Sequence, residues 1–192
     1  MTKILIGTHN IGKFKEIAYL LPKKYKKVSP IYLKIPSPKE TGKSFKENSK
    51  LKANFFSKFV NYPVISDDSG LCIKCLNNKP GVYSARLAKK HGSFFKAMKF
   101  ILKKMKNKKN RSATFVCSLS FKFPKKKAIN VTGRLKGIIS KKILGDKGFG
   151  YDPIFIPNNL KKTFGEMSKR KKLKIDHRYL AFKKLKKKIK IL

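Results

Sequence analysis

The chain has very few acidic residues. Its 192 residues include nine Asp and Glu against 50 Lys and Arg, which gives a formal net charge of +41. Three cysteines provide no disulfide framework, and no apolar run reaches the roughly 18 to 20 residues of a membrane span. The length and the 41% hydrophobic content suit one folded domain and exclude a disordered chain. The apolar stretch 4–6 is too short for a signal peptide, so we expect a cytoplasmic protein.

The excess of positive charge raises the hypothesis of a nucleic-acid-binding protein, which would neutralise phosphates. The basic residues are spread along the chain, however, and only five of the 50 are Arg. Arg is the residue that makes bidentate contacts with phosphates and bases, so a charge made mainly of Lys favours a solvated surface. We therefore do not expect nucleic acid to be the main ligand, and a nucleic-acid-binding protein stays as the alternative function.

The scarce acids are the better guide to function, because Lys occupies most other polar positions. The nine are Glu16, Glu40, Glu47, Asp67, Asp68, Asp146, Asp152, Glu166 and Asp176. Asp67 and Asp68 are adjacent and follow the apolar stretch 62–66, which reads as a buried strand. The sequence predicts a turn over 67–70 at the end of this strand. Open α/β sheets bind their ligands at such strand ends.

The pattern of apolar residues predicts an α/β domain without a linker or a repeat. Helices are expected after 7–10, from Ser44, around 94–105 and at the C-terminus, and strands at 4–6, 27–35, 71–76, 113–123, 128–139 and 154–156. Ser44 and Glu47 form an S-x-x-E capping box, and Leu51, Phe55 and Phe59 follow at helical spacing. The C-terminal helix is expected to present Phe182, Leu185, Ile189 and Leu192 on one face.

A glycine-rich turn at 7–13 lies between the first strand and the first helix. Its residues fit G-x-x-x-x-G-K, the first seven positions of a phosphate-binding loop. Phe14 stands where such a loop needs Ser or Thr to bind Mg²⁺, so any metal must be held by carboxylates elsewhere. Backbone N–H groups at the helix start and the ammonium of Lys13 still predict an anion site. The alternative is an ordinary strand-to-helix turn with Asn10 as its cap.

Four carboxylates are candidates for holding Mg²⁺: Glu40, Glu47, Asp67 and Asp68. One or two carboxylates together with substrate phosphate suffice for this ion. Each has a structural alternative, since Glu47 can complete the capping box, Glu40 can be solvated, and one aspartate can bond turn amides. The Cys72-x-x-Cys75 pair lacks the further ligands of a zinc site and reads as buried strand cysteines.

Eight motifs occur in an order that resembles the inosine/xanthosine triphosphate pyrophosphatase family, also called Ham1-like. They are Thr8-His9-Asn10-Ile11-Gly12-Lys13, Glu40-Thr41-Gly42, Ser44-Phe45-Lys46-Glu47-Asn48 with Lys52-Ala53, Asp67-Asp68-Ser69-Gly70-Leu71, Pro80-Gly81-Val82-Tyr83-Ser84-Ala85-Arg86, Gly148-Phe149-Gly150-Tyr151-Asp152-Pro153, Thr163-Phe164-Gly165-Glu166-Met167 and His177-Arg178. Each motif alone is modest, but their joint order and spacing are specific.

The resemblance implies one domain over 1–192 that hydrolyses dITP, ITP and XTP to the monophosphate and pyrophosphate. It implies Mg²⁺ as the cofactor and a homodimer, without a membrane. The implied fold is an elongated α/β domain with a mixed sheet, two lobes and a central nucleotide cleft. A pyrophosphatase for pyrimidine nucleotides remains an alternative.

The resemblance also implies roles for particular residues. The loop Thr8, His9, Asn10, Ile11, Gly12 and Lys13 would bind the triphosphate. Glu40 and Asp68 would hold Mg²⁺, and Asp68 would accept the proton of the attacking water. Ser69 would contact substrate, and the nucleotide pocket would be lined by Phe149, Gly150, Tyr151, Asp152, Lys172, His177 and Arg178.

Two features of the chain depart from the family pattern or leave it open. Asp176 precedes His177 where the family usually has Ser, which adds a negative charge close to the implied base pocket. Lys172 lies in a Lys-rich run, where Lys171 or Lys174 could replace it. Nothing is carried over from the family for residues 87–92, where the match is poor.

Overall fold

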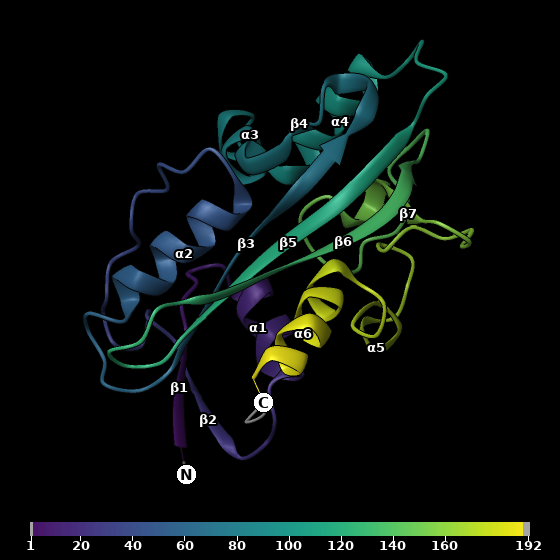
Figure 1. Ribbon diagram of the computed structural model, residues 1–192. Helices are drawn as coiled ribbons and strands as arrows, with labels where there is room; N and C mark the ends of the chain where they lie inside the picture. Colours follow the sequence, from purple (N-terminus) through teal and green to yellow (C-terminus); the bar gives the residue numbers. More distant parts are fainter. Residues whose placement is uncertain (1, 190–192) are drawn as a thin grey trace. The chain divides into compact units, whose positions relative to one another are not determined.

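The structure is a computed structural model that describes residues 2–189 (Figure 1). In chain order, the helices and strands are β1 (Thr2–Ile6), α1 (Ile11–Leu20), β2 (Tyr25–Val28), α2 (Phe45–Phe56), β3 (Val64–Ile73), β4 (Lys79–Pro80), α3 (Ser84–Lys90), α4 (Phe94–Lys104), β5 (Ser112–Lys122), β6 (Ile129–Ile139), β7 (Phe155–Pro157), α5 (Lys169–Lys172) and α6 (His177–Lys188). Within this range no helix is long and apolar enough to span a membrane. The expected position of Leu192 on the last helix lies outside the described residues.

Seven strands of the described chain form a mixed sheet, as the α/β prediction requires. The strand order is β2-β1-β3-β5-β6-β7, and β4 pairs with β3. β1 runs parallel to β2 and β3, whereas the β3–β4 and β6–β7 pairs are antiparallel. The class and the mixed sheet are therefore confirmed.

The described chain divides into two compact units that share strands. Unit 1 contains residues 2–68, 117–133 and 178–189, and unit 2 contains 69–116 and 134–177. β3, β5 and β6 each begin in one unit and end in the other.

Helices cover both faces of the sheet in unit 1. Ile4 and Ile6 of β1 are buried with Ile17 of α1 and with α6, and these two helices lie side by side in Figure 1. Leu5 lies between them in sequence and is buried in a separate cluster with Phe56 of α2. Because alternate side chains of a strand point to opposite faces, β1 is apolar at every central position.

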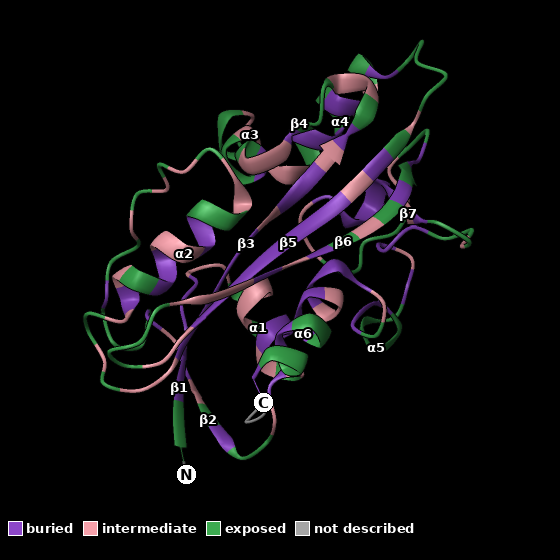
Figure 2. Ribbon diagram, in the orientation of Figure 1, coloured by how far each residue is buried: buried purple, intermediate pink, exposed green. Residues whose placement is uncertain are grey.

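Unit 2 has one apolar core beneath α3 and α4. Leu71 and Ile73 of β3 are buried there with Met98 and Ile101 of α4, and with Phe155 of β7. The colouring by burial shows β3 and β5 as mostly buried, β6 as only partly buried, and the helices as buried along one side (Figure 2). Four helical residues at the predicted spacing, 94, 98, 101 and 105, therefore do form the expected apolar face.

The expected turn at 67–70 was wrong. Asp67 and Asp68 lie inside β3, which runs without a break from Val64 to Ile73. Asp and Gly are usually found in turns. Here the carboxylates of Asp67 and Asp68 lie near Lys13 and Lys52, whose positive charges compensate the cost of burying acids within a strand.

Three further expectations need correction. The strand predicted at 27–35 is only β2, Tyr25–Val28, and residues 30–34 form turns. In α2 the buried face is formed by Asn48, Ser49, Lys52, Ala53 and Phe56, not by Leu51, Phe55 and Phe59. The side of α2 that faces the rest of the protein is therefore largely polar, and the apolar spacing of the sequence pointed to the wrong side of the helix. The strand predicted at 71–76 ends at Ile73, and Cys72 and Cys75 are half-buried.

Candidate active site

The predicted anion turn is built in unit 1 by the junction of β1 and α1. The Asn10 side chain caps α1 by accepting a hydrogen bond from the Lys13 backbone N–H at 3.0 Å. The Thr8 hydroxyl accepts one from the Asn10 backbone N–H at 3.2 Å. The first backbone N–H groups of α1 and the Lys13 ammonium make this junction attractive to a phosphate group. The cap and the anion site, stated as alternatives from the sequence, are thus compatible.

His9 and its neighbours fix the path of this turn. The His9 Nε2 lies 2.9 Å from the backbone carbonyl of Ile35, so Nε2 carries the proton in the neutral ring. Its Nδ1 is buried without a hydrogen-bond partner among the described residues. Ile11 is exposed and Gly12 is half-buried. The side chain of His9 therefore anchors the loop, while its contact with a triphosphate remains a prediction.

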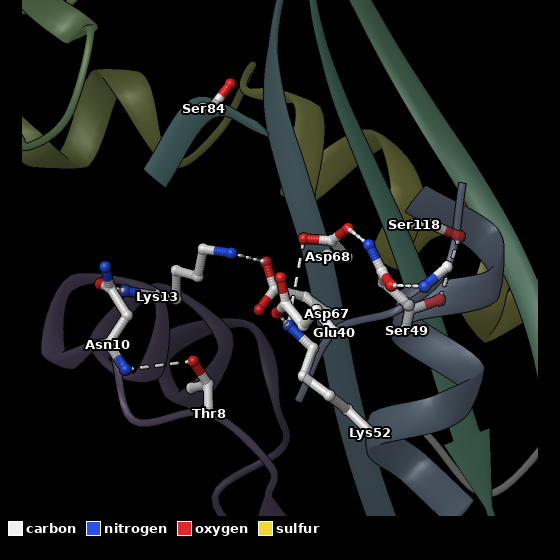
Figure 3. Close-up of polar contacts among 12 residues, drawn as sticks. Thr8, Asn10, Lys13, Glu40, Ser49, Lys52, Asp67, Asp68, Ser84 and Ser118 are labelled. Atoms are coloured by element: carbon white, nitrogen blue, oxygen red, sulfur yellow. Dashed lines mark hydrogen bonds and ion pairs between the residues drawn. The ribbon is translucent and has the colours of Figure 1, made fainter. Parts of the chain in front are cut away.

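Lys13 reaches from α1 to the acids of β3. Its Nζ lies 3.3 Å from Oδ2 of Asp67, which is fully buried. Figure 3 shows the ammonium directed at this carboxylate. The anion turn and the acidic strand, which are more than 50 residues apart in sequence, therefore form one site in unit 1.

Lys52 of α2 joins the two carboxylates that the family resemblance assigned to a metal. Its Nζ donates to Oε1 of Glu40 at 2.7 Å and lies 4.0 Å from Oδ1 of Asp68 (Figure 3). Glu40 and Asp68 thus converge on a single positive charge. Carboxylate oxygens are the ligands that Mg²⁺ prefers, and this ion needs only one or two of them. The donor set fits Mg²⁺, and residues 2–189 hold no group of three His, Cys, Asp or Glu suited to a metal.

Burial and charge set the ionisation of Asp68 and Lys52. Burial raises the pKa of the Asp68 carboxyl, although Lys52 and Lys13 oppose the shift. Burial disfavours the charged form of Lys52, but Asp67, Asp68 and Glu40 outweigh that effect and raise its pKa. Asp68 is consequently a stronger base than an exposed aspartate, and Lys52 stays an ammonium at neutral pH.

Arg178 has acidic partners in unit 1. Its Nη1 donates to Oε2 of Glu16 at 2.6 Å, and its Nε lies 3.5 Å from Oδ2 of Asp67. The guanidinium is almost fully buried. Arg178 therefore balances charge beside Asp67, and its contact with a base remains a prediction. Sequence reasoning gave Glu16 no role, although the scarcity of acids marked it.

In unit 2, Asp152 and Lys172 form a buried ion pair. Oδ2 of Asp152 accepts hydrogen bonds from Lys172 Nζ at 2.5 Å and from the Phe149 backbone N–H at 2.8 Å. Lys172 Nζ also lies 4.8 Å from the centre of the Phe149 ring and 5.5 Å from that of Phe164. Lys172 is buried, whereas Lys171 and Lys174 are exposed, and its contact with a base stays a prediction.

The loop before Asp152 depends on a glycine. Gly148 has φ +77°, and a Cβ on it would lie 2.1 Å from Oδ2 of Asp152. A side chain is therefore excluded by both the backbone and the carboxylate. The loop can carry the Phe149 ring beside the ion pair only because position 148 is bare.

The other predicted residues of unit 2 have internal partners. The Tyr151 hydroxyl donates to the backbone carbonyl of Ser84 at 2.9 Å, and burial raises its pKa. The His177 ring stacks on Phe115 with a centroid distance of 4.7 Å and an interplanar angle of 9°. Gly150 and Ser69 are half-buried. Sequence reasoning missed Phe115, which carries no motif and looks like any apolar strand residue.

Comparison with known proteins identifies the family. The profile of the Ham1 family matches residues 4–188. Proteins named dITP/XTP pyrophosphatase from Dictyoglomus thermophilum and Bacillus subtilis are each 40% identical to the chain, which they match over 95% and 97% of its length and over 92% and 96% of their own.

Two solved structures have the same fold over almost their whole length. A Ham1 protein from Staphylococcus aureus has a TM-score of 0.87 at 35% identity and covers 98% of both chains. A HAM1 protein from Coxiella burnetii has a TM-score of 0.89 at 30% identity and covers 100% of both. With its profile, its relatives and its fold in agreement, this chain belongs to the Ham1 family.

Proposed function

We propose that this chain is a nucleoside-triphosphate pyrophosphatase that hydrolyses dITP, ITP and XTP to the monophosphate and pyrophosphate. The observation that carries the proposal is the meeting of the Lys13 turn with the buried acids of β3 in unit 1. The names of the curated relatives, dITP/XTP pyrophosphatase, support the substrate class.

Within unit 1, cations of the chain bind the phosphates, and one acid accepts a proton from the attacking water. Lys13 and the N–H groups of the α1 start bind phosphate oxygens. Glu40 and Asp68 would hold Mg²⁺, and this ion would neutralise phosphate charge and lower the pKa of water. Asp68 accepts the proton of the water that attacks the innermost phosphorus.

The bond changes balance without any further reactant. The water oxygen forms a bond to the α-phosphorus, and the bond from that phosphorus to the bridging oxygen of pyrophosphate breaks. The water proton goes to Asp68 and then to solvent. Lys52, held as an ammonium beside Asp68, limits the negative charge that collects at these acids.

Unit 2 supplies the groups that we assign to base recognition. Phe149 offers an aromatic ring for stacking on a purine. Lys172 and His177 are donors suited to a 6-oxo group, whereas the 6-amino group of adenine is itself a donor and would be rejected. The ion pair with Asp152 fixes the Lys172 ammonium in place.

A nucleotide panel tests the proposal. Pyrophosphate release is measured with dITP, ITP, XTP, dATP, dGTP, dCTP and dUTP, each with Mg²⁺ and with chelator. We expect hydrolysis of the first three that is lost with chelator. Faster hydrolysis of pyrimidine nucleotides would show that the substrates are pyrimidines and not purines. Tight binding of duplex nucleic acid without nucleotide hydrolysis would favour the nucleic-acid alternative.

The assembly and the compartment complete the proposal. We propose a homodimer in the cytoplasm, where the free nucleotide pool is found. The support is the family resemblance, and light scattering of the purified protein tests the dimer by its mass.

A further inference from the structure

Asn48 links the two regions of unit 1 that carry the proposed metal ligands. It is fully buried in α2. Its Oδ1 accepts a hydrogen bond from the Gly42 backbone N–H at 2.8 Å. Its Nδ2 donates to Oδ2 of Asp68 at 3.0 Å. One side chain thus holds both the loop that follows Glu40 and the acid on β3.

The orientation of the Asn48 amide follows from these partners. A backbone N–H can only donate, so the atom that faces Gly42 must be the carbonyl oxygen. The NH₂ group therefore faces Asp68 and occupies its Oδ2. The other oxygen, Oδ1, is the one on the side of Lys52, which also contacts Glu40. Asn48 thereby holds one Asp68 oxygen and leaves the other facing Lys52, the residue that also contacts Glu40.

Gly42 makes this bridge depend on close contact. A Cβ at position 42 would lie 2.6 Å from Oδ1 of Asn48 and 2.7 Å from Cβ of Glu47. The loop backbone can approach α2 closely only without a side chain there. Since Glu40 lies two residues before Gly42, the contact sets where the Glu40 side chain begins.

Asn48 and Lys52 act from one face of α2. They are four residues apart, and side chains at this spacing lie one above the other on a helix. Asn48 holds Oδ2 of Asp68, while Lys52 contacts Oδ1 of Asp68 and Oε1 of Glu40. The rotation of α2 about its axis therefore controls both contacts together.

A group of polar residues beneath α2, three of them fully buried, fixes this rotation. We call Ser49, Ser118, Ser120 and Asn130 the serine–asparagine cluster. The Ser49 hydroxyl lies 2.9 Å from that of Ser120, and Asn130 Nδ2 lies 3.0 Å from Ser49 Oγ and 2.8 Å from Ser120 Oγ. Figure 3 shows Ser49 and Ser118 next to the acids of β3. The cluster ties α2 to β5 and β6 immediately beside Asn48.

We propose that Asn48 is a positioning residue that holds Glu40 and Asp68 in the mutual arrangement needed to bind a divalent cation. The proposal rests on the assignment of these acids as metal ligands under the proposed function. Partners that orient metal ligands typically contribute about 10- to 100-fold to metal affinity or activity.

The test compares Asn48→Leu with the wild type and with Asn54→Ala. Leu has the same branched arrangement of four side-chain heavy atoms as Asn but neither donates nor accepts, and Asn54 is an exposed residue of the same helix. Mn²⁺ binding is measured by calorimetry without nucleotide, and kcat and KM for dITP are measured at saturating Mg²⁺. For Asn48→Leu we expect Mn²⁺ affinity and kcat to fall about 10- to 100-fold with KM nearly unchanged. Asn54→Ala should match the wild type.

Two further variants separate positioning from folding. Gly42→Ala leaves Asn48 in place but forces the loop away, so it should reproduce the loss of Mn²⁺ affinity even if Asn48→Leu fails to fold. Ser49→Ala removes the one cluster hydroxyl on α2 while both Asn48 contacts stay available, so it should lower the melting temperature and lower Mn²⁺ affinity by less than Asn48→Leu does.

The outcomes distinguish this inference from the proposed function. Wild-type Mn²⁺ affinity and kcat in folded Asn48→Leu, or equal losses in Asn54→Ala, would overturn the role of Asn48 alone. If the wild type binds Mn²⁺, loses it with Asn48→Leu, and hydrolyses no nucleotide, the positioning role stands and the proposed function fails.

Discussion

The two units use buried acid–lysine pairs in different ways. In unit 1 the cations Lys13 and Lys52 contact three carboxylates, and Glu40 keeps 30% of its side chain exposed. In unit 2, Asp152 and Lys172 are both nearly inaccessible, and aromatic rings flank the ammonium. An arrangement with more acids than cations and with solvent access suits exchange of ions and protons. A closed pair suits fixing one donor in one place.

The largest effect is expected at the acid that handles the proton in unit 1. Asp68→Asn keeps the shape of the side chain and its contact region but removes the base. We expect kcat for dITP to fall by about 10²- to 10⁴-fold, the range of general-base catalysis, with an unchanged circular dichroism spectrum. Asp146→Asn, at an exposed acid, is the control. Retained turnover in Asp68→Asn would remove Asp68 from the reaction.

The closed pair of unit 2 should respond in stability. Lys172→Met leaves the Asp152 carboxylate buried without its cation, and breaking a buried pair in this way costs about 3–5 kcal/mol of unfolding free energy. The double variant Lys172→Met/Asp152→Leu should recover much of the loss, because no lone charge remains. Urea unfolding measures both. An equal loss of unfolding free energy in the single and double variants would show that the unpaired Asp152 charge is not the cause of the loss.

A smaller effect is expected at the anion turn. Lys13→Ala removes one cation from the phosphates and from Asp67, so we expect KM for dITP to rise by about 10-fold, as for a charge-assisted contact of about 1.5 kcal/mol. Lys15→Ala, on the exposed side of α1, is the matched control. The Michaelis constants measure the difference. An unchanged KM in Lys13→Ala would count against phosphate binding at this turn.

The smallest effect is a pH dependence of stability that comes from Asp68. Its pKa in the folded protein is raised above the ordinary 3.8, so the protonated form favours folding. This contribution to the free energy of unfolding is present below the unfolded pKa and is lost as pH rises through the folded pKa. We expect the wild type, in chelator, to lose stability from about pH 4 upward relative to Asp68→Asn, as measured by urea unfolding across pH. A wild type that instead gains stability over this pH range relative to Asp68→Asn would mean that the pKa of Asp68 is lowered in the folded protein.

The sequence could predict the parts of the fold that depend on local signals. The capping residue Ser44 correctly placed the start of α2, where its side chain accepts a hydrogen bond from the Glu47 backbone N–H. The apolar spacing correctly predicted α4 and the long strands β5 and β6. Such signals act within a few residues and can be read along the chain.

Features that depend on distant partners could not be predicted. β3 continues through Asp67 and Asp68 because Lys13 and Lys52, from two separate helices, balance their charges. The polar face of α2 was missed because its partners, Ser118, Ser120 and Asp68, lie 20 to 71 residues further along the chain. The acids themselves were found, because they are rare against so many lysines.

The measurement that tests the proposed chemistry most directly is hydrolysis of dITP in ¹⁸O-labelled water, followed by mass spectrometry of both products. Attack of water on the innermost phosphorus, with Asp68 as proton acceptor, predicts one labelled oxygen in dIMP and unlabelled pyrophosphate. Label in pyrophosphate, or release of orthophosphate in its place, would contradict the proposed reaction at these acids.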